Sequence, residues 1–171
     1  MNNNQTFRNG NSHGASPESA PHSITNIKNF LNIATHNVQG LSSTIKQQQF
    51  SAFISNSRYD IIGISETKLS QKNAQYLLKN VNNTEYTSWW DSSGKQLGSG
   101  VGILINKSLA KQVRKCKSYK GRIIYVDLFF KGKSCLRIIQ FYNHADSNHK
   151  KENIELYKVL YEYITELKPK I

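Results

Sequence analysis

Glu66 and Asn37 are the two residues of this sequence whose types and positions first suggest chemistry. Glu66 offers the hard carboxylate oxygens that Mg²⁺ prefers, and this ion is often held by one or two carboxylates together with waters and a substrate phosphate. The simpler interpretation is a solvent-exposed Glu66 that pairs with Lys68, and an Asn37 that ends a strand because Asn tolerates turn geometry. Neither residue alone decides between a metal site and an ordinary surface.

Two predicted strands would bring these residues together. The segment 31–37 (LNIATHN) is predicted to be a strand, and 61–64 (IIGI) has the β-branched composition of a buried strand. Between them, the Ser-Ser-Thr run at 42–44 can cap a helix. The inward face of this helix is predicted to hold Ile45, Phe50, Phe53 and Ile54. The strands of such a unit run parallel, so Asn37 and Glu66 leave the same sheet edge, where ligands of α/β proteins bind.

The remaining predicted elements are mostly strands. In chain order they are a short helix from about Ser70, strands at 86–90, 101–105, 121–130 and 134–142, and a helix at 151–167. Lys131-Gly132-Lys133 is a hairpin signal between the last two strands. The final helix is predicted to bury a stripe made of Ile154, Tyr157, Leu160, Tyr161, Ile164 and Leu167. A parallel pair followed by antiparallel strands predicts a mixed α/β (α+β) fold.

Residues 1–28 are predicted to form a disordered polar tail. Leu, Val and Trp are absent from this segment, which is rich in Asn, Ser and Gly, so it cannot bury enough apolar surface to offset its chain entropy. It has neither the apolar core of a signal peptide nor the amphipathic spacing of a mitochondrial presequence. We expect no membrane span in the chain, because no apolar run is long enough.

The formal net charge of +12 falls on the rest of the chain, because Arg8 and Glu18 cancel within residues 1–27. Lys and Arg are most dense between 107 and 133. A basic domain favours polyanions such as nucleic acid or an anionic membrane, and the alternative is a solvated Lys-rich surface. Cys116 and Cys135 form no metal-binding pattern, and we expect both to be reduced thiols of an intracellular protein.

Four segments of the sequence resemble, in order and spacing, the motifs of the endonuclease/exonuclease/phosphatase (DNase I-like) superfamily. They are IATHNVQGL, YDIIGISETKL, GSGVGILIN and RIIYVDLFFKGKSCLRIIQFY. The SETKL motif is similar to the corresponding motif of apurinic/apyrimidinic endonucleases and of LINE-type retrotransposon endonucleases. The resemblance implies that residues 29–171 form an incomplete domain. Its fold would be a partial four-layer α/β sandwich with mixed, largely antiparallel sheets, whose C-terminal part is missing.

The resemblance also implies roles for individual residues. Glu66 would be the metal ligand, for Mg²⁺ or Mn²⁺ bound weakly. Asn37 would orient the attacking water or the metal-site carboxylate, and the Tyr142 hydroxyl would contact the scissile phosphate, so both are candidate catalytic residues. Gln39 and Lys68 would contact substrate phosphates or Glu66. The expected partner is nucleic acid, with DNA preferred, and neither a membrane nor a small-molecule cofactor is expected.

Two places in the sequence limit this resemblance. The family usually has a Pro shortly after its Tyr, whereas Tyr142 precedes Asn143-His144-Ala145, so we expect a more mobile loop and a less firmly placed Tyr. His144 and His149 receive no role, because a loop His is usually only solvated. Trp89 and Trp90 should point to opposite faces of one strand, so one is expected in the core and only the other could stack on a base.

The later motifs of the family, Gly-Asp-x-Asn and Ser-Asp-His, do not occur in the 171 residues. Acid–base assistance contributes about 10²–10⁴-fold to such reactions, so we expect almost no activity from these residues alone. Three hypotheses remain open. The chain is an inactive fragment of a metal-dependent endonuclease of mobile-element origin, a nucleic-acid-binding remnant without catalysis, or a phosphoesterase of the same superfamily for lipid or small-molecule phosphates.

Overall fold

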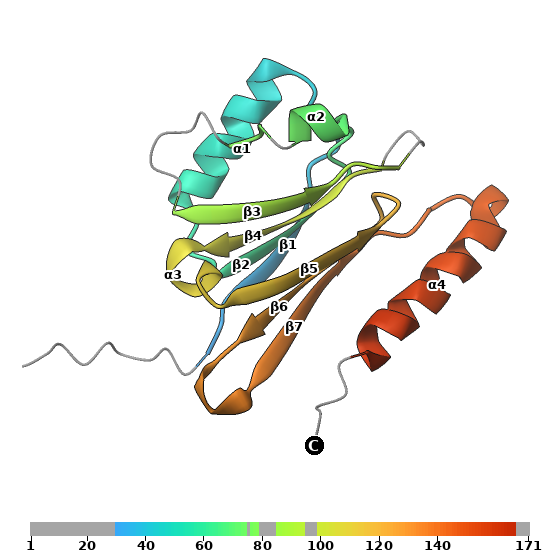
Figure 1. Cartoon of the computed structure of the whole chain (residues 1–171). Coiled ribbons are helices and arrows are strands. Elements are labelled where there is room, and N and C mark those ends of the chain that lie inside the picture. Colours follow the sequence, from blue (N-terminus) through green and yellow to red (C-terminus); the bar gives the residue numbers. More distant parts are fainter. Residues whose placement is uncertain (1–29, 75, 79–84, 95–98, 167–171) are drawn as a thin grey trace, which may run out of the picture.

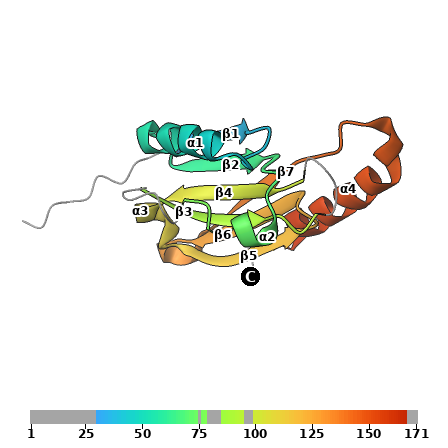
Figure 2. The same cartoon turned by 90° about the horizontal axis from the view of Figure 1, so that it is seen from above.

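The computed structural model describes residues 30–74, 76–78, 85–94 and 99–166. The predicted tail at 1–28 lies outside the described residues. Two sheets face each other, with helices α1 and α2 outside the first sheet and α4 outside the second (Figure 1). Seen from above, α1 and α4 lie toward opposite ends of the molecule (Figure 2). No helix of the described part is long and apolar enough to cross a membrane.

The first sheet, sheet A, contains the predicted parallel pair. Its strands in spatial order are β1 (Ile33–Asn37), β2 (Ile61–Ser65), β4 (Val101–Asn106) and β3 (Tyr86–Asp91). β1 runs parallel to β2, and the other neighbours are antiparallel. β2 is buried along its whole length because both faces of the sheet are covered there, which explains its continuous apolar sequence.

Helix α1 (Thr44–Asn56) forms the predicted connection between β1 and β2. It begins at Ser43, whose side chain accepts a hydrogen bond from the backbone of Lys46 at 3.3 Å. Phe50 and Ile54 are buried as predicted, whereas Ile45 is 69 % exposed and Phe53 is 38 % exposed. The predicted face was therefore wrong at these two positions. Five residues of helix turn Ile45 about 140° away from Phe50, so a narrow stripe cannot hold both.

Sheet B has the order β5–β6–β7, all antiparallel. β6 (Ile123–Phe129) and β7 (Cys135–Phe141) form the predicted hairpin, which turns at Gly132 with a φ of 80°. β5 (Val113–Tyr119) and the short helix α3 (Lys107–Ala110) were not predicted. β5 is an edge strand with mostly polar side chains, and a register shift between Val113 and Lys115 breaks its alternation. Charged edge strands of this kind discourage pairing with other chains.

Three apolar cores fill the three spaces between the four layers. The outer core of sheet A holds Phe50 and Ile54 of α1 together with Ala74 and Leu77, from α2 (Gln71–Ala74) and the turn after it. The core between the sheets consists of Ile61, Val101, Ile103, Ile105, Ile124, Val126 and Leu128. The third core joins sheet B to α4 through Ile123, Tyr125, Leu156 and Tyr163. The four-layer sandwich predicted from the resemblance is thereby confirmed.

Helix α4 (Lys150–Thr165) packs on sheet B with a face that shares only Leu160 with the predicted stripe, among the described residues. Leu156 and Tyr163 are buried, and Val159 and Leu160 pack beside them. The predicted stripe is largely exposed at Ile154, Tyr157, Tyr161 and Ile164, and Leu167 lies outside the described residues. Both stripes have helical spacing, so spacing alone could not decide between them. The stripe that packs is the one that meets the aromatic and aliphatic residues of β6.

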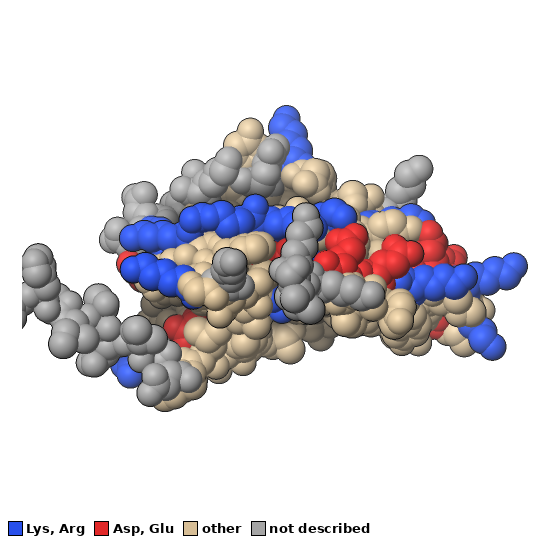
Figure 3. Space-filling view, turned by 60° about the horizontal axis from the view of Figure 1, so that its bottom comes forward, with Lys and Arg blue, Asp and Glu red and all other residues tan. Residues whose placement is uncertain are grey.

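Lys and Arg side chains form a row on one face of the molecule, which ends against a group of acidic side chains (Figure 3). Lys115 and Lys117 of β5 both pair with Glu166, and Lys120 pairs with Glu155 of α4. Part of the positive charge between 107 and 133 is therefore balanced by acidic residues in and just after α4. Cys116 and Cys135 are free thiols on the two outer strands of sheet B, as predicted.

Candidate active site

Asn37 and Glu66 meet at the C-terminal ends of β1 and β2. Asn37 lies opposite Ser65 in the parallel register, so the next residue along β2 is Glu66. The Asn37 amide nitrogen donates to Glu66 Oε1 at 2.9 Å. The other end of the same amide, Asn37 Oδ1, accepts from the backbone N–H of Gln39 at 3.0 Å. The amide is thus oriented at both ends, with its N–H toward the carboxylate.

Tyr142 reaches the same carboxylate from sheet B. It directly follows β7, and its hydroxyl donates to Glu66 Oε1, the oxygen that Asn37 also contacts. Its backbone N–H donates to the Arg122 carbonyl at 2.8 Å, and the Arg122 guanidinium lies 5.2 Å from its ring centroid. The following loop is tied to α4, because Asn153 bonds both backbone groups of His144 at 3.2 Å. The structure shows contacts that hold this loop, and the greater mobility expected of it stays a prediction.

Lys68 and Gln39 occupy different positions relative to Glu66. Lys68 Nζ lies 3.3 Å from Glu66 Oε2, the oxygen that neither Asn37 nor Tyr142 contacts. Gln39 takes part through its backbone, whose carbonyl accepts from Lys46 Nζ at 3.0 Å. The Gln39 side chain makes no hydrogen bond to any described residue. Of the two predicted contacts to Glu66, the side chain of Lys68 is present and that of Gln39 is not.

The loops that carry these side chains have unusual backbone geometry. Gln39, Glu66 and Lys68 have φ values of 49°, 55° and 52°, in the left-handed region that favours Gly. Each such residue costs about 1–3 kcal/mol and persists only where its surroundings enforce it. The two loops enforce it by bonding one another, with Gly40 N–H on the Glu66 carbonyl at 2.7 Å and Leu41 N–H on the Thr67 carbonyl at 2.8 Å.

This geometry coincides with a match to a known family. The sequence profile of the endonuclease/exonuclease/phosphatase family matches residues 34–149, a span that contains Asn37, Glu66 and Tyr142. The chain belongs to this family. No curated protein matches the chain at a significant level.

A solved structure supports the family fold. The chain is similar to the crystal structure of the AP endonuclease LMAP from Leishmania major, with a TM-score of 0.53 and 17 % sequence identity. The match covers 67 % of this chain and 40 % of that one, so the chain spans less than half the length of the AP endonuclease. At this identity the similarity establishes the fold, as a partial endonuclease/exonuclease/phosphatase domain.

The electrostatics keep Glu66 ionised and Tyr142 protonated. The hydrogen bond from Tyr142, then that from Asn37, and then Lys68 lower the pKa of Glu66 against the raising effect of burial. Burial, followed by the neighbouring Glu66, raises the pKa of Tyr142. At neutral pH the site therefore combines a carboxylate with a phenol that donates to it. This is the protonation state in which an endonuclease/exonuclease/phosphatase site could hold a cation.

The donor set fits a single, largely hydrated Mg²⁺ ion. Among the described residues, no three His, Cys, Asp or Glu side chains gather into a group that could hold a metal. Mg²⁺ keeps several waters and accepts one or two carboxylates plus substrate phosphates, so Glu66 could hold it together with a substrate phosphate and waters. Glu66 Oε2 is the oxygen available to it, with Lys68 as the present counter-charge.

Arg122 is the neighbour of this site that sequence reasoning missed. It is 5 % exposed and precedes β6, between Gly121 and the buried Ile123. Burial lowers the pKa of its guanidinium, while Tyr142 and Glu66 favour the charged form. The only signal in the sequence was a cation at the start of an otherwise apolar strand.

The remaining candidates are not arranged for a role at Glu66. Trp89 packs against the core between the sheets and Trp90 against the outer core of sheet A, so both contribute to cores. The prediction that one of them is in the core is confirmed, and the other does not form a free stacking platform. His144 and His149 stack on each other with ring centroids 4.6 Å apart.

Proposed function

We propose that residues 29–171 carry the metal-binding half of a nucleic-acid phosphodiesterase site, in a domain that is incomplete within these residues. The single observation that carries the proposal is the convergence of Asn37 and Tyr142 on one oxygen of Glu66. Two neutral donors on Oε1 fix the carboxylate and leave Oε2 for a cation. A surface Glu that merely pairs with a Lys would need neither donor.

The roles of the residues follow from their positions. Glu66 would hold Mg²⁺ or Mn²⁺, which when bound supplies a Lewis acid that polarises a phosphoryl oxygen. Asn37 holds the carboxylate in place, and Tyr142 does so from the other sheet with a hydroxyl that can turn to a phosphate oxygen. Lys68 is a mobile cation beside the same position and would pair with substrate phosphate once a metal neutralises Glu66. Gln39 contributes its backbone to the loop, and its side chain is free to reach a phosphate.

The residues that would activate water are absent from the 171 residues, since neither Gly-Asp-x-Asn nor Ser-Asp-His occurs. Losing acid–base assistance costs about 10²–10⁴-fold in rate. We therefore expect binding of metal and nucleic acid with very slow hydrolysis. The net charge of +12 supports nucleic acid as the partner, with DNA preferred, and the YDIIGISETKL wording supports an origin in a mobile element.

A plasmid-nicking assay with Mg²⁺ or Mn²⁺ tests the hydrolytic part of the proposal. We expect at most trace nicking, abolished by Glu66→Gln and retained by Glu162→Gln, which makes the same chemical change on the exposed side of α4. Stabilisation of the chain against heat by Mn²⁺, present in the wild type and lost in Glu66→Gln, tests the metal site without relying on activity. Equal stabilisation of both proteins would overturn the assignment of Glu66.

Salt dependence distinguishes a nucleic-acid-binding remnant from an enzyme for smaller phosphates. Phosphate contacts make the affinity for DNA fall steeply as salt rises. A steep fall without nicking would favour the non-catalytic remnant. Metal-dependent release of phosphate from a lipid or small-molecule ester, with no salt-dependent DNA binding, would favour a phosphoesterase of the same superfamily.

A further inference from the structure

A cavity of about 360 Å³ lies beside the candidate site, between the ends of the sheets and the first turns of α4. Its charged and titratable lining consists of Lys120, Arg122, His144, Glu152 and Glu155. Cavities of this size can take a small ligand. Because Arg122 also contacts the ring of Tyr142, the cavity and the Glu66 site share one wall.

Arg122 lines this cavity, and its guanidinium has no hydrogen-bond partner among the described residues. The residue is 5 % exposed, and among the described residues no carboxylate, carbonyl or hydroxyl accepts from its guanidinium. The interaction described for the guanidinium itself is with the face of Tyr142, whose ring centroid lies 5.2 Å away. A buried charge is costly unless it is paired and hydrogen-bonded, so an Arg held in this way is expected to have a function.

Arg137 provides a contrast within the same sheet. Its side chain is also buried, but it donates to both oxygens of Asp127, at 2.6 Å and 2.7 Å, and to the carbonyl of Tyr163. Among the described residues, the fold therefore supplies acceptors to all three nitrogens of the Arg137 guanidinium and none to that of Arg122. The Arg122 guanidinium therefore has the same N–H donors as Arg137, but no described residue accepts a hydrogen bond from them.

The two carboxylates of the cavity lie against side chains other than Arg122. Glu155 accepts from Lys120 at 3.0 Å and from the Tyr119 hydroxyl, and Glu152 lies 3.5 Å from His149 Nδ1. Burial, followed by Arg122 and His149, lowers the pKa of His144 and favours its neutral form. Among the described residues that line the cavity, no carboxylate is thus bonded to the positive charge of Arg122.

We propose that Arg122 is the centre of an anion subsite that takes a phosphate group of the substrate next to the phosphate bound at Glu66. This subsite rests on the proposed function, because it assumes a substrate with more than one phosphate. The planar guanidinium donates two parallel hydrogen bonds to a phosphate, and such charge-assisted bonds are the strong ones. Tyr142 separates the two positions, with its hydroxyl toward Glu66 and its ring toward Arg122.

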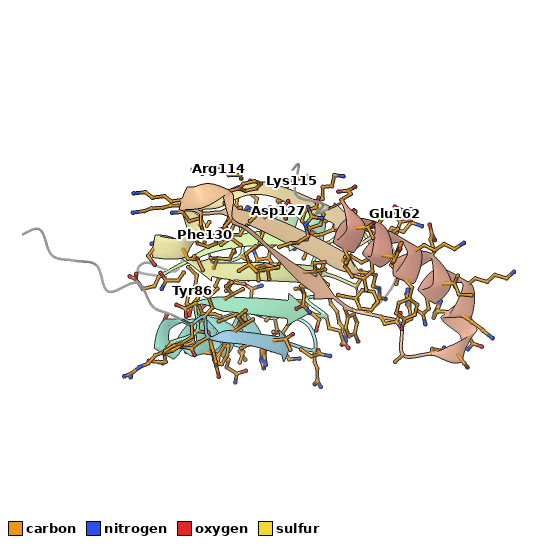
Figure 4. All side chains as sticks on the ribbon, turned by 90° about the horizontal axis from the view of Figure 1, so that it is seen from below. Tyr86, Arg114, Lys115, Asp127, Phe130 and Glu162 are labelled. Carbon is orange, nitrogen blue, oxygen red and sulfur yellow. The ribbon has the colours of Figure 1, made fainter. Side chains whose placement is uncertain are left out.

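The test compares Arg122→Met with Arg114→Met in the full chain, without metal and with a chelator present. Arg114 is exposed on β5 and donates only to backbone carbonyls, at 2.9 Å and 3.4 Å, so it is a matched control (Figure 4). Binding of a short fluorescent single-stranded DNA is measured by anisotropy at several salt concentrations. Thermal unfolding is measured with and without inorganic pyrophosphate.

We expect Arg122→Met to bind the DNA about tenfold or more weakly, which is the typical effect of losing a hydrogen bond to a charged group. The slope of log affinity against log salt should become less steep by about 0.7, the value for one phosphate contact on a single strand. Pyrophosphate should raise the melting temperature of the wild type and of Arg114→Met but not of Arg122→Met. Without ligand, Arg122→Met should melt no lower than the wild type, because no described acceptor is left unpaired.

Wild-type DNA affinity, salt slope and pyrophosphate response in Arg122→Met would overturn the subsite. If this variant does not fold, Arg122→Lys is measured instead, since Lys retains the positive charge but cannot donate two parallel hydrogen bonds to a phosphate. Folded Arg122→Lys with weakened pyrophosphate binding supports the subsite, and wild-type binding overturns it. These measurements need neither metal nor nicking. If the chain never nicks DNA but shows the expected effects of Arg122→Met, the anion subsite is supported and the proposed hydrolysis is not.

Discussion

Glu66 is bonded unequally on its two oxygens, and this inequality determines what the residue can do. Oε1 accepts from Asn37 and Tyr142, whereas Oε2 faces only the ammonium of Lys68 at 3.3 Å. Neutral donors hold the carboxylate without cancelling its charge. The charge is balanced by the partly exposed Lys68, the group that a cation would have to displace under the proposed function.

The depressed pKa of Glu66 predicts a pH-dependent contribution to stability. A carboxyl group whose folded pKa lies below its ordinary value of 4.5 stabilises the fold above that value, and loses this contribution as the pH falls through the folded pKa. We expect wild type to exceed Glu66→Gln in unfolding free energy near neutral pH and to lose part of that advantage at about pH 3. Urea unfolding at both pH values measures this difference. A difference that does not change with pH would contradict the prediction.

Lys68 is expected to compete with a metal ion for Glu66. Lys68→Met should raise the affinity for Mn²⁺ by about two- to fivefold, as expected when a partly exposed ion pair no longer has to be broken. Lys46→Met is the matched control, because Lys46 bonds the nearby Gln39 carbonyl and not the carboxylate. Calorimetric titration of Mn²⁺ into the three proteins gives the affinities. Equal gains in both variants would indicate a general charge effect.

At the scale of elements, the strand–helix–strand unit was predictable because its signals are local. Ser43 caps α1, β1 lies parallel to β2, and the hairpin turns at Gly132, all as the sequence indicates. β5 was missed because its alternation is interrupted and most of its side chains are polar. The packing face of α4 was missed because two stripes share the same spacing, and only the partner surface selects one.

The residues of the candidate site also differ in how far the sequence could predict their positions. Asn37 and Glu66 could be paired from topology, because the ends of two parallel strands must meet. Tyr142 could be joined to them only by family resemblance, since its contact requires two sheets to face each other. The local signal at Arg122, a cation before an apolar strand, could not predict its position, because its burial comes from the packing of sheet B against α4 and the loops.

Shortening a side chain to Ala is expected to be costly on the buried stripe of α4 and nearly neutral on its exposed stripe. Leu156→Ala should lower the free energy of unfolding by about 2–5 kcal/mol, because it removes buried methyl groups from the third core. Ile164→Ala, on the exposed stripe, should change it by about 0.5 kcal/mol or less. Urea unfolding of the two variants distinguishes the faces. Similar losses in both would mean that the exposed stripe is also covered in solution.

At the scale of the whole molecule, the Asp127–Arg137 pair connects three elements. The two residues are opposite one another on β6 and β7, and Arg137 also donates to the Tyr163 carbonyl of α4 and lies 3.8 Å from the ring centroid of Tyr125. Asp127 lies within sheet B beside α4 (Figure 4). The pair orients the helix on the sheet through bonds that apolar contacts alone would not provide.

Removing one member of this pair should be worse than removing both. Arg137→Met leaves a buried carboxylate without its partner, which typically costs about 3–5 kcal/mol, whereas replacing both members by apolar residues is often nearly neutral. We expect Arg137→Met to melt well below the wild type, and the double variant Asp127→Leu/Arg137→Met to recover most of the loss. Circular dichroism of thermal unfolding measures both. A double variant as unstable as the single one would contradict this account.

Because one oxygen of Glu66 receives Asn37 from the first sheet and Tyr142 from the second, the site exists only in the conformation in which the two sheets are closed on each other. Opening of the sandwich at this edge breaks the Tyr142 bond, whereas Asn37 and Glu66 belong to the same sheet and can stay bonded, so completion of the site and sheet closure are a single equilibrium. A ligand that binds the assembled carboxylate must therefore shift the chain toward the closed form. Binding at Glu66 would be read out as slower hydrogen exchange in β1 and β7, strands that lie in different sheets.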